Sequence, residues 1–352
     1  MIPAAHAVPV ERALRAAFGV AACDSIQPLT AGLSPALVYR IEVGGCPYLL
    51  RINLNPISDP ARWFASMGAA AAAGLGPAVR YTSVDDKISI TDFVERKPLP
   101  RASALRLLPP MLRAVHTLPP FPPMARFPDY LDAGDAFIGR WRAAGTLPET
   151  IAAEIFPAYA RLRRAYTREA DDLVASHNDL NPGNILFDGT RLWLVDWEAA
   201  FLNHRYVDLA VVANFVAATA ADEEYLLDAY FGQPATEYQR TRFYLMQQFA
   251  HLFYAALLLG MNRRGPQRGF AAPPAYARAS SGAPEPQAGA APTLDLDAPT
   301  PAFRDLHDRL WSGEASLASA EAKLEYGRVH LNQLRHNFGT GRFQLALRAQ
   351  RR

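Results

Sequence analysis

The feature that most constrains this chain is the stretch ASHNDLNPGNILFDGTRLWLVDWEAAF, residues 175–201. It places His177, Asp179 and Asn184 within eight residues. An apolar run, a turn and a second apolar run follow, and the second run ends on Asp196. This pattern predicts a β-hairpin that sets Asn184 and Asp196 side by side. A lone Asp or Asn in a turn usually caps the local backbone, but the whole set in register favours a reaction centre.

These residue types suit the transfer of a phosphoryl group. Such a group carries charge on its oxygens, so the site must supply cations, and magnesium prefers carboxylate, amide and phosphate oxygens. Asp196 and Asn184 are therefore the candidate metal ligands. Asp179 is the candidate carboxylate that accepts or orients the proton of the attacking hydroxyl. We expect His177 to hold the loop by hydrogen bonds and Asp208 to brace it, both as structural residues of the site.

The composition narrows the class of protein. The chain has 352 residues, of which 50% are hydrophobic and 20% charged, with a net charge of +2. This balance gives no electrostatic footprint for nucleic acid. The N-terminus lacks the pattern of a signal peptide, and no run of about 18 apolar residues predicts insertion into a membrane. The two cysteines, Cys23 and Cys46, have no metal-type spacing. They indicate reduced thiols, so we expect a cytoplasmic protein.

The pattern changes near residue 95. Before it, an amphipathic stretch at 8–22 precedes strand-prone runs joined through Gly44-Gly45, a hairpin signal. A helix-prone, Ala-rich stretch at 60–73 is followed by two more strand candidates. After residue 100 the pattern is mostly helical, with the last long helix expected at about 314–337.

We therefore predict an α+β fold with two lobes. The N-terminal lobe, residues 1–95, would hold an antiparallel sheet, and the larger C-terminal lobe, residues 96–352, would be mostly helical. Residues 264–302 are rich in Ala, Pro and Gly. Such a composition cannot bury enough apolar surface to order itself, so it predicts a disordered loop.

The order His-x-Asp-Leu-x-x-x-Asn, followed by an apolar strand and a second Asp, resembles the catalytic loop of protein kinases. Asn178 replaces the usual Arg, and Asp196 leads Asp-Trp-Glu in place of Asp-Phe-Gly. With these features, residues 177–208 resemble the choline kinase and aminoglycoside phosphotransferase families, which share a protein-kinase-like fold. The Glu after Asp-Trp and the later sequence NHRYVD are more similar to choline and ethanolamine kinases.

The resemblance implies ATP and Mg²⁺ as cofactors. The stretch LTAGLSPALVYRI resembles the family's nucleotide loop, which implies phosphate contacts at Gly32 and Ser34. Arg51, in PYLLRI, is implied to contact phosphate through its planar guanidinium. The stretch ITDFVE resembles the segment that links the lobes, which implies adenine contacts from the backbone between Asp92 and Val94.

The family's next helix offers a Glu that pairs with the basic residue. In this chain the corresponding place holds Arg62 or Trp63, and no Glu lies between residues 43 and 94. Asp59 is the nearest acid to the start of that helix. The sequence therefore leaves the partner of Arg51 open.

The predicted function is an ATP- and Mg²⁺-dependent kinase acting on the hydroxyl of a small molecule, choline or ethanolamine first. A quaternary ammonium acceptor would need aromatic rings and a carboxylate, and Glu198 is the candidate carboxylate because it follows Asp196. Most downstream aromatics are expected to be core, and a minority of them to touch the acceptor. The candidates are Trp197, Phe215, Tyr230, Tyr244, Phe249, Phe253, Tyr254, Trp311 and Tyr326.

Two alternatives stay open. An aminoglycoside or other sugar-type kinase uses the same chemistry, but its pocket is typically acidic. A nucleotide-binding pseudokinase with a scaffold role belongs to a different class, and the missing helix Glu is its only support.

Overall fold

The computed structural model describes residues 2–29, 36–55, 59–123, 129–260, 295–296 and 298–350. Two of the predicted site residues, Gly32 and Ser34, lie outside the described residues, as does most of the predicted loop at 264–302. The disorder predicted for that loop stays a prediction, and the few described residues of the loop contact the rest of the chain. There, Leu296 is buried, and the main-chain carbonyl of Asp295 accepts a hydrogen bond from Arg328.

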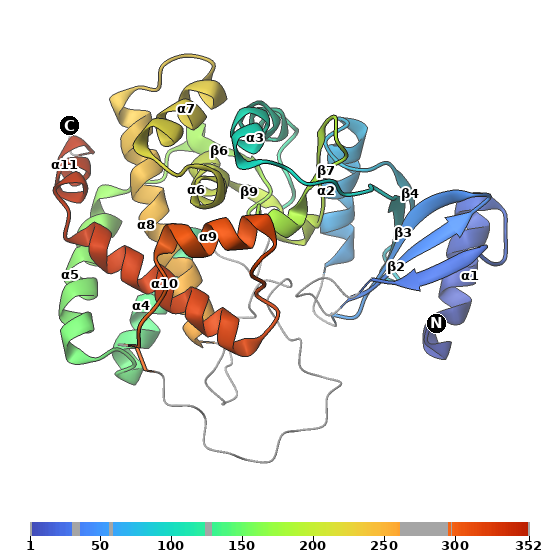
Figure 1. Ribbon diagram of the computed structural model, residues 1–352, viewed down its shortest axis with the longest axis horizontal. Helices are drawn as coiled ribbons and strands as arrows, with labels where there is room; N and C mark the ends of the chain where they lie inside the picture. The colour runs from blue at the N-terminus through green and yellow to red at the C-terminus, as the bar shows by residue number, and fades with distance from the viewer. Residues whose placement is uncertain are drawn as a thin grey trace.

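An antiparallel sheet of five strands forms one end of the molecule, in the order β1-β2-β3-β5-β4 (Figure 1). Its strands are β1 (Ser25–Pro28), β2 (Ala36–Val43), β3 (Cys46–Asn53), β4 (Val79–Ser83) and β5 (Ile88–Asp92). Gly44 and Gly45 connect β2 to β3 with φ angles of 60° and 75°. A two-residue hairpin turn requires this left-handed backbone, so the predicted hairpin is confirmed.

Two helices belong to this end of the chain. Helix α1 (Ala4–Phe18) packs on β4 and β5. It begins four residues before the predicted stretch and ends at Phe18, and Gly19, with a φ of 75°, forms its left-handed C-terminal cap. Helix α2 (Pro60–Ala72) lies between the sheet and the rest of the molecule (Figure 1). The Asp59 side chain caps its N-terminus by accepting a hydrogen bond from the backbone N–H of Arg62.

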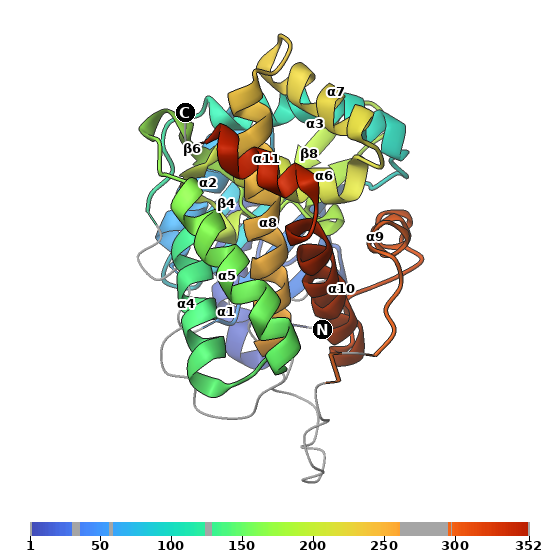
Figure 2. The same ribbon diagram turned by 90° about the vertical axis from the view of Figure 1, so that its left-hand side faces the viewer.

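The rest of the molecule is mostly helical and is arranged around α8, which packs against α4, α6, α10 and α11 (Figure 2). Residues 241–259 of α8 are buried on every side, as expected for a helix at the centre of a bundle. The helices of this part are α3 (Arg101–His116), α4 (Tyr130–Ala144), α5 (Glu149–Ala165), α6 (Arg205–Val216), α7 (Ala220–Phe231), α8 (Glu237–Gly260), α9 (Phe303–Ser312), α10 (Ala320–Phe338) and α11 (Gly341–Ala349).

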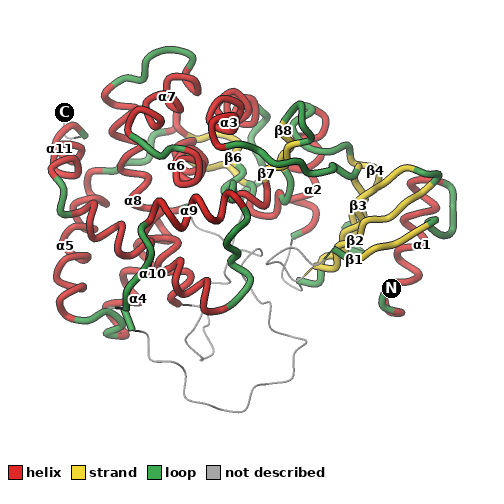
Figure 3. The backbone as a smooth tube through the Cα atoms, viewed as in Figure 1, coloured by secondary structure: helices red, strands yellow, loops and turns green. Residues whose placement is uncertain are grey.

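Short strands and turns separate the sheet from the helices (Figure 3). β6 (Leu173–Ser176) pairs with β9 (Phe201–His204), and β7 (Ile185–Phe187) pairs with β8 (Leu192–Leu194), both antiparallel. The β7–β8 pair is the hairpin that the sequence predicted. Three 3₁₀ turns flank these strands: η1 (Ala170–Asp172), η2 (Pro182–Asn184) and η3 (Trp197–Ala199).

The buried apolar side chains form two clusters. One joins α1 to β2, β3 and β5, and the larger one runs through the helices and includes β7, β8 and Ala70 of α2. The antiparallel sheet followed by a helical region confirms the predicted α+β class. The lobe boundary between residues 95 and 96 stays a prediction. Among the helices of the described residues, none combines the length and hydrophobicity needed to span a membrane.

Candidate active site

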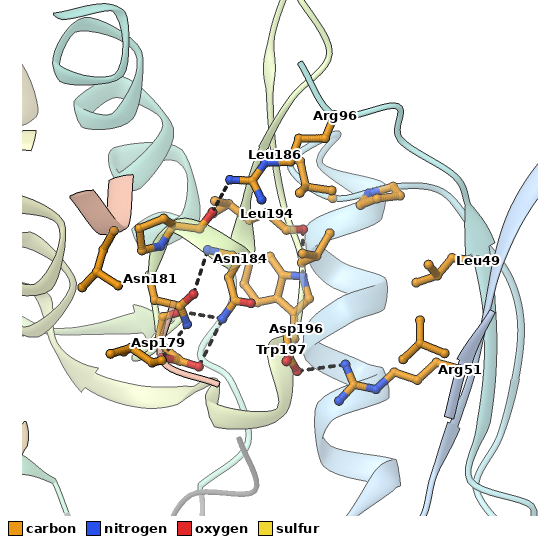
Figure 4. A pocket seen from close by; sticks show the side chains of 18 of the residues that line it. Leu49, Arg51, Arg96, Asp179, Asn181, Asn184, Leu186, Leu194, Asp196 and Trp197 are labelled. Carbon is orange, nitrogen blue, oxygen red and sulfur yellow. Dashed lines mark hydrogen bonds and ion pairs between the residues drawn. The ribbon is translucent and has the colours of Figure 1, made fainter. Parts of the chain in front are cut away.

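A cavity of about 670 Å³ lies between the sheet and the helical region. It brings together residues that are far apart in the sequence: Arg51 of β3, then Asp179, Asn184 and Asp196 (Figure 4). We call residues 177–208 the catalytic segment, because it contains most of the predicted site residues.

Asp179 lines the cavity and is buried, with 4% of its surface exposed. Its Oδ1 accepts a hydrogen bond from Asn181 Nδ2 at 3.1 Å. Its Oδ2 accepts one from Asn184 Nδ2 at 3.1 Å. The carboxylate is thus held in one orientation by two amide groups. A carboxylate fixed in this way at a cavity wall is suited to receive or orient a proton.

Asn184 lies between Asp179 and Asp196 (Figure 4). Its Nδ2 donates to the main-chain carbonyl of Asp179 at 2.8 Å as well as to the carboxylate. Because the amide nitrogen faces Asp179, the amide oxygen faces away from it. The hairpin fixes this arrangement, since the N–H of Val195 donates to the carbonyl of Asn184 at 3.1 Å.

The amide oxygen of Asn184 and the carboxylate of Asp196 are hard oxygen donors on one cavity, which is the ligand type that Mg²⁺ takes. Within the described residues, no group of three or more His, Cys, Asp or Glu side chains is placed to hold a metal ion. A magnesium ion held by these two residues would complete its shell with phosphate oxygens and water. The set does not resemble a metal site made of protein ligands alone.

His177 and Asn178 fix the backbone of the catalytic segment. His177 Nε2 lies 2.9 Å from the carbonyl oxygen of Val195, and a carbonyl only accepts, so this nitrogen carries the hydrogen. Asn178 has a φ of 64°, a conformation that Asn adopts more readily than most residues. Its Nδ2 donates to the carbonyl of Ala199 at 3.0 Å, and its Oδ1 accepts from Asn203 at 2.7 Å.

Asp208, at the start of α6, is fully buried below this loop. Its carboxylate accepts hydrogen bonds from the N–H groups of His177, at 2.8 Å, and Asn178, at 2.7 Å. His116 Nε2 of α3 lies 3.1 Å from the same carboxylate. These contacts support the structural role proposed for His177 and Asp208. His116 was not identified from the sequence, because its link to the site depends on the packing of α3 against α6.

Arg51 has two carboxylate partners, although the sequence left its partner open. Its Nη1 lies 3.1 Å from Asp196 Oδ1, and its Nη2 forms an ion pair with Glu198 Oε1. Burial favours the neutral guanidinium, but the two carboxylates outweigh this effect and raise the pKa of Arg51.

Glu198 is 2% exposed, and its carboxylate faces the sheet. Its Oε1 accepts from Asn53 Nδ2 at 2.9 Å as well as from Arg51. Burial raises the pKa of Glu198 to about 7, and the Arg51 cation opposes this shift. Because both partners belong to β3, this geometry does not favour the predicted contact between Glu198 and the acceptor.

Arg62 of α2 is one of the two residues, with Trp63, at the place where the family resemblance expects a Glu. It is buried, with 6% of its surface exposed, and its guanidinium donates to the main-chain carbonyls of Glu198 and Ala200. Trp63 also lies close to Arg51, with its ring centroid 6.0 Å from the guanidinium carbon. The sequence pointed to both positions but did not predict what they bind.

The predicted adenine contacts lie at the end of β5. The N–H groups of Asp92 and Phe93 donate to main-chain carbonyls at 2.9 and 3.4 Å, which fixes this stretch of backbone. Thr91, directly before Asp92, lines the cavity. The contacts of Asp92 and Val94 with adenine stay a prediction.

Opposite the sheet, the cavity is lined by three aromatic rings, Phe215 of α6, Tyr254 of α8 and Tyr326 of α10. We call these three rings the acceptor wall. Burial raises the pKa of Tyr326, and the neighbouring Tyr254 and the Asp179 carboxylate add to this shift. Of the nine aromatics considered from the sequence, these three and Trp197 line the cavity.

The loop between α9 and α10 also lines the cavity, through small residues such as Gly313, Ala315 and Ala318. The sequence predicted helix from about residue 314, which is wrong for these residues. Helix α10 begins at Ala320, because the side chain of Ser319 caps it by accepting from the N–H of Ala322 at 3.0 Å.

Three buried histidines, His251, His307 and His330, lie behind the acceptor wall. Burial lowers the pKa of His251 and His307 to about 3 and also lowers that of His330. Neutral His307 has its Nδ1 2.8 Å from the carbonyl of Phe303, so that nitrogen carries the hydrogen. Its Nε2 must then accept the hydroxyl of Tyr326, at 3.0 Å. The hydroxyl is thereby directed away from the cavity.

Comparison with known proteins extends this description. The model of the phosphotransferase enzyme family, APH, matches residues 25–244, more than half of the chain. Protein LicA of Haemophilus influenzae is 35% identical over 75 residues. That match covers 21% of this chain and 26% of LicA, so the chain spans about a quarter of the length of this curated relative.

Solved structures share the fold. A choline/ethanolamine kinase family protein from Mesorhizobium loti has a TM-score of 0.56 at 20% identity, covering 94% of this chain and 99% of the other. The choline kinase LicA from Streptococcus pneumoniae has a TM-score of 0.53 at 14% identity, covering 74% and 92%. The ternary complex of streptomycin, ATP and APH(2″)-IIa has a TM-score of 0.54 at 11% identity, covering 75% and 93%. At these identities the likeness concerns the fold alone, whereas the family match extends over the sheet and the catalytic segment. The chain belongs to the phosphotransferase enzyme family.

Proposed function

We propose that this protein is an ATP- and Mg²⁺-dependent kinase that phosphorylates the hydroxyl of a small organic cation, with choline as the first candidate and ethanolamine as the second. The observation that carries the proposal is the cavity itself. Its lining combines the buried carboxylate of Asp179, a pair of metal-type oxygen donors and three aromatic rings.

The residues divide the work of the reaction between them. Asp179 accepts or orients the proton of the acceptor hydroxyl, and Asn181 and Asn184 keep its carboxylate in place. Asn184 and Asp196 would hold Mg²⁺, which when bound supplies positive charge to the phosphate oxygens. Arg51 adds a second cation on the side of the sheet. In the APH(2″)-IIa complex ATP is a ligand, which supports ATP as the donor here.

The lining of the cavity favours an acceptor with a single positive charge. Among its lining residues within the described chain, the carboxylates are Asp179 and Asp196. Asp196 is assigned to the metal, which leaves Asp179 and the acceptor wall to face the acceptor. A quaternary ammonium cannot donate hydrogen bonds and is attracted by aromatic faces, so the wall favours choline over ethanolamine. An aminoglycoside has several ammonium groups, for which this lining offers too few carboxylates.

An acceptor contest tests the proposal. Purified protein would be given ATP and MgCl₂ with choline, ethanolamine or kanamycin, and ADP release would be followed by a coupled assay. Mass spectrometry would identify the phosphorylated product. We expect kcat/KM to be highest for choline, lower for ethanolamine and at background for kanamycin. Faster turnover of kanamycin than of choline would contradict the acceptor assignment. ATP binding without turnover of any acceptor in a broad panel would favour the pseudokinase alternative.

A further inference from the structure

Two arginines and two acids from three separate elements meet beside the cavity. Arg51 of β3 bridges Asp196 and Glu198. Arg62 of α2 donates to the carbonyls of Glu198 and Ala200. The four formal charges of the cluster sum to zero, and the cluster ties the sheet, α2 and the turn after β8 together.

In the proposed reaction, Asp196 binds the metal and Arg51 contacts the phosphates. If Asp196 binds Mg²⁺, its carboxylate is drawn from Arg51 toward the metal, and Arg51 keeps Glu198 as its remaining acidic partner in the cluster. The side chain of Arg51 is 14% exposed and that of Glu198 is 3% exposed. A guanidinium this deeply buried is costly without an anionic partner. Glu198 therefore stabilises Arg51 inside the cavity throughout the reaction.

The direction of the Glu198 side chain supports the same role. Its Oε1 accepts from Arg51 and from Asn53, which both belong to β3. Tyr254 and Tyr326 approach the cavity from the opposite side, on α8 and α10. The carboxylate is thus directed to the strand that holds Arg51, away from the acceptor wall.

Arg62 fixes the turn that carries Glu198. Its guanidinium donates to two carbonyls of that turn, and burial lowers its pKa. The planar, forked donors of arginine suit such a pair of acceptors. Helix α2 therefore contributes a cation that holds the backbone, while the turn contributes the acid that holds Arg51.

We propose, on the basis of the proposed function, that Glu198 is a positioning residue for the nucleotide: its carboxylate directs Arg51 at the phosphates, and Arg62 anchors the turn that makes this possible. This assignment replaces contact with the acceptor as the role of Glu198. It implies that removing the carboxylate weakens binding of the phosphates and leaves binding of the nucleoside unchanged.

The test compares ATP with adenosine, which lacks the phosphates. Affinities would be measured by calorimetry with MgCl₂ and without acceptor. In Glu198→Gln, we expect ATP to bind roughly tenfold to a hundredfold more weakly, the range for one hydrogen bond to a charged group, and adenosine to bind as in the wild type. Glu198→Asp keeps the charge in the turn but shortens the side chain, so an intermediate loss is expected.

A double-mutant cycle identifies the mediator. Arg51→Gln should weaken ATP binding as much as Glu198→Gln does, and the double variant should lose little more, because both changes remove one function. Glu42→Gln is the matched control. Glu42 forms an ion pair with Arg40, and both residues lie on β2, the strand that neighbours β3 in the sheet. This control should leave both affinities unchanged.

The outcomes separate this inference from the proposed function. ATP binding unchanged in Glu198→Gln, or fully additive effects in the cycle, would overturn the positioning role while the kinase proposal stands. Equal losses for ATP and adenosine would also overturn it, because they indicate a structural role only. A wild-type protein that binds adenosine no less tightly than ATP would instead contradict the kinase proposal.

Discussion

The catalytic segment and the acceptor wall line the same cavity, but they are built in opposite ways. In the catalytic segment, buried polar groups are held by directional hydrogen bonds, several of them within the segment, such as those from Asn181 and Asn184 to Asp179. The acceptor wall consists of rings from three helices, backed by buried histidines that are neutral at ordinary pH.

In the proposed function, this difference corresponds to two tasks. Hydrogen bonds with fixed directions hold the reacting groups where the chemistry needs them. Aromatic faces attract a cation from many directions, so in the proposed function they would select the class of acceptor and not a single geometry. Changes in the catalytic segment should therefore lower kcat, whereas changes in the acceptor wall should raise KM for the acceptor.

The largest expected effect comes from Asp179. In Asp179→Asn the group that receives the proton is lost, so we expect kcat to fall about 10²- to 10⁴-fold, with the melting temperature close to that of the wild type. Steady-state kinetics and a thermal melt measure the two quantities. The exposed Asp171, outside the cavity, gives the control Asp171→Asn, which should retain full activity. Substantial turnover by Asp179→Asn would remove Asp179 from the reaction.

The histidines behind the acceptor wall should make the fold sensitive to acid. Their pKa values are lowered in the folded protein, to about 3 for His251 and His307. Below pH 6.5 the unfolded chain binds protons that the folded protein does not, so stability is present at neutral pH and is lost as the pH falls toward 3. At pH 5 each such histidine accounts for about 2 kcal/mol of this loss.

Denaturant unfolding at pH 7.5 and pH 5 measures this effect. The variant His251→Asn should lose less stability than the wild type between the two pH values, by about 2 kcal/mol. His336 is exposed on the same helix as His330. The control variant His336→Asn should therefore lose as much stability between the two pH values as the wild type. The same pH dependence in His251→Asn as in the wild type would show that this ring is not held neutral by burial.

The smallest effect is expected at the acceptor wall. Tyr254→Leu keeps an apolar side chain but removes the aromatic face, so KM for choline should rise about tenfold while kcat and the KM for ATP change little. The exposed Tyr225 gives the control Tyr225→Leu. A fall in kcat with unchanged KM would mean that the ring acts on the chemistry, and the contrast between the two sides of the cavity would not hold.

Much of the catalytic segment could be predicted because its contacts are local in the sequence. Asn184 reaches Asp179 over five residues, and the hairpin follows from two apolar runs around a turn. The fold class and both predicted hairpins are confirmed for this reason. The roles of the individual site residues stay predictions, and those of Gly32 and Ser34 lie outside the described residues.

The partner of Arg51 could not be predicted, because 147 residues separate it from Glu198. Sequence comparison looked for an acid on α2, whereas the acid comes from the turn after β8 and α2 supplies Arg62. Likewise, a row of aromatics at helical spacing is compatible with core packing or with a binding wall. Only the packing of α6, α8 and α10 decides which rings reach the cavity.

The sequence by itself determined the α+β class, the hairpin of the catalytic segment and the kind of chemistry, because strand pattern, turn residues and short-range hydrogen bonds depend on neighbours in the chain. The tertiary structure alone decided which charge faces Arg51, which three rings form the acceptor wall, and that the loop before α10 lines the cavity. These features depend on contacts between distant elements, and the residue types at each position allow several such arrangements. Burial and packing select one of them.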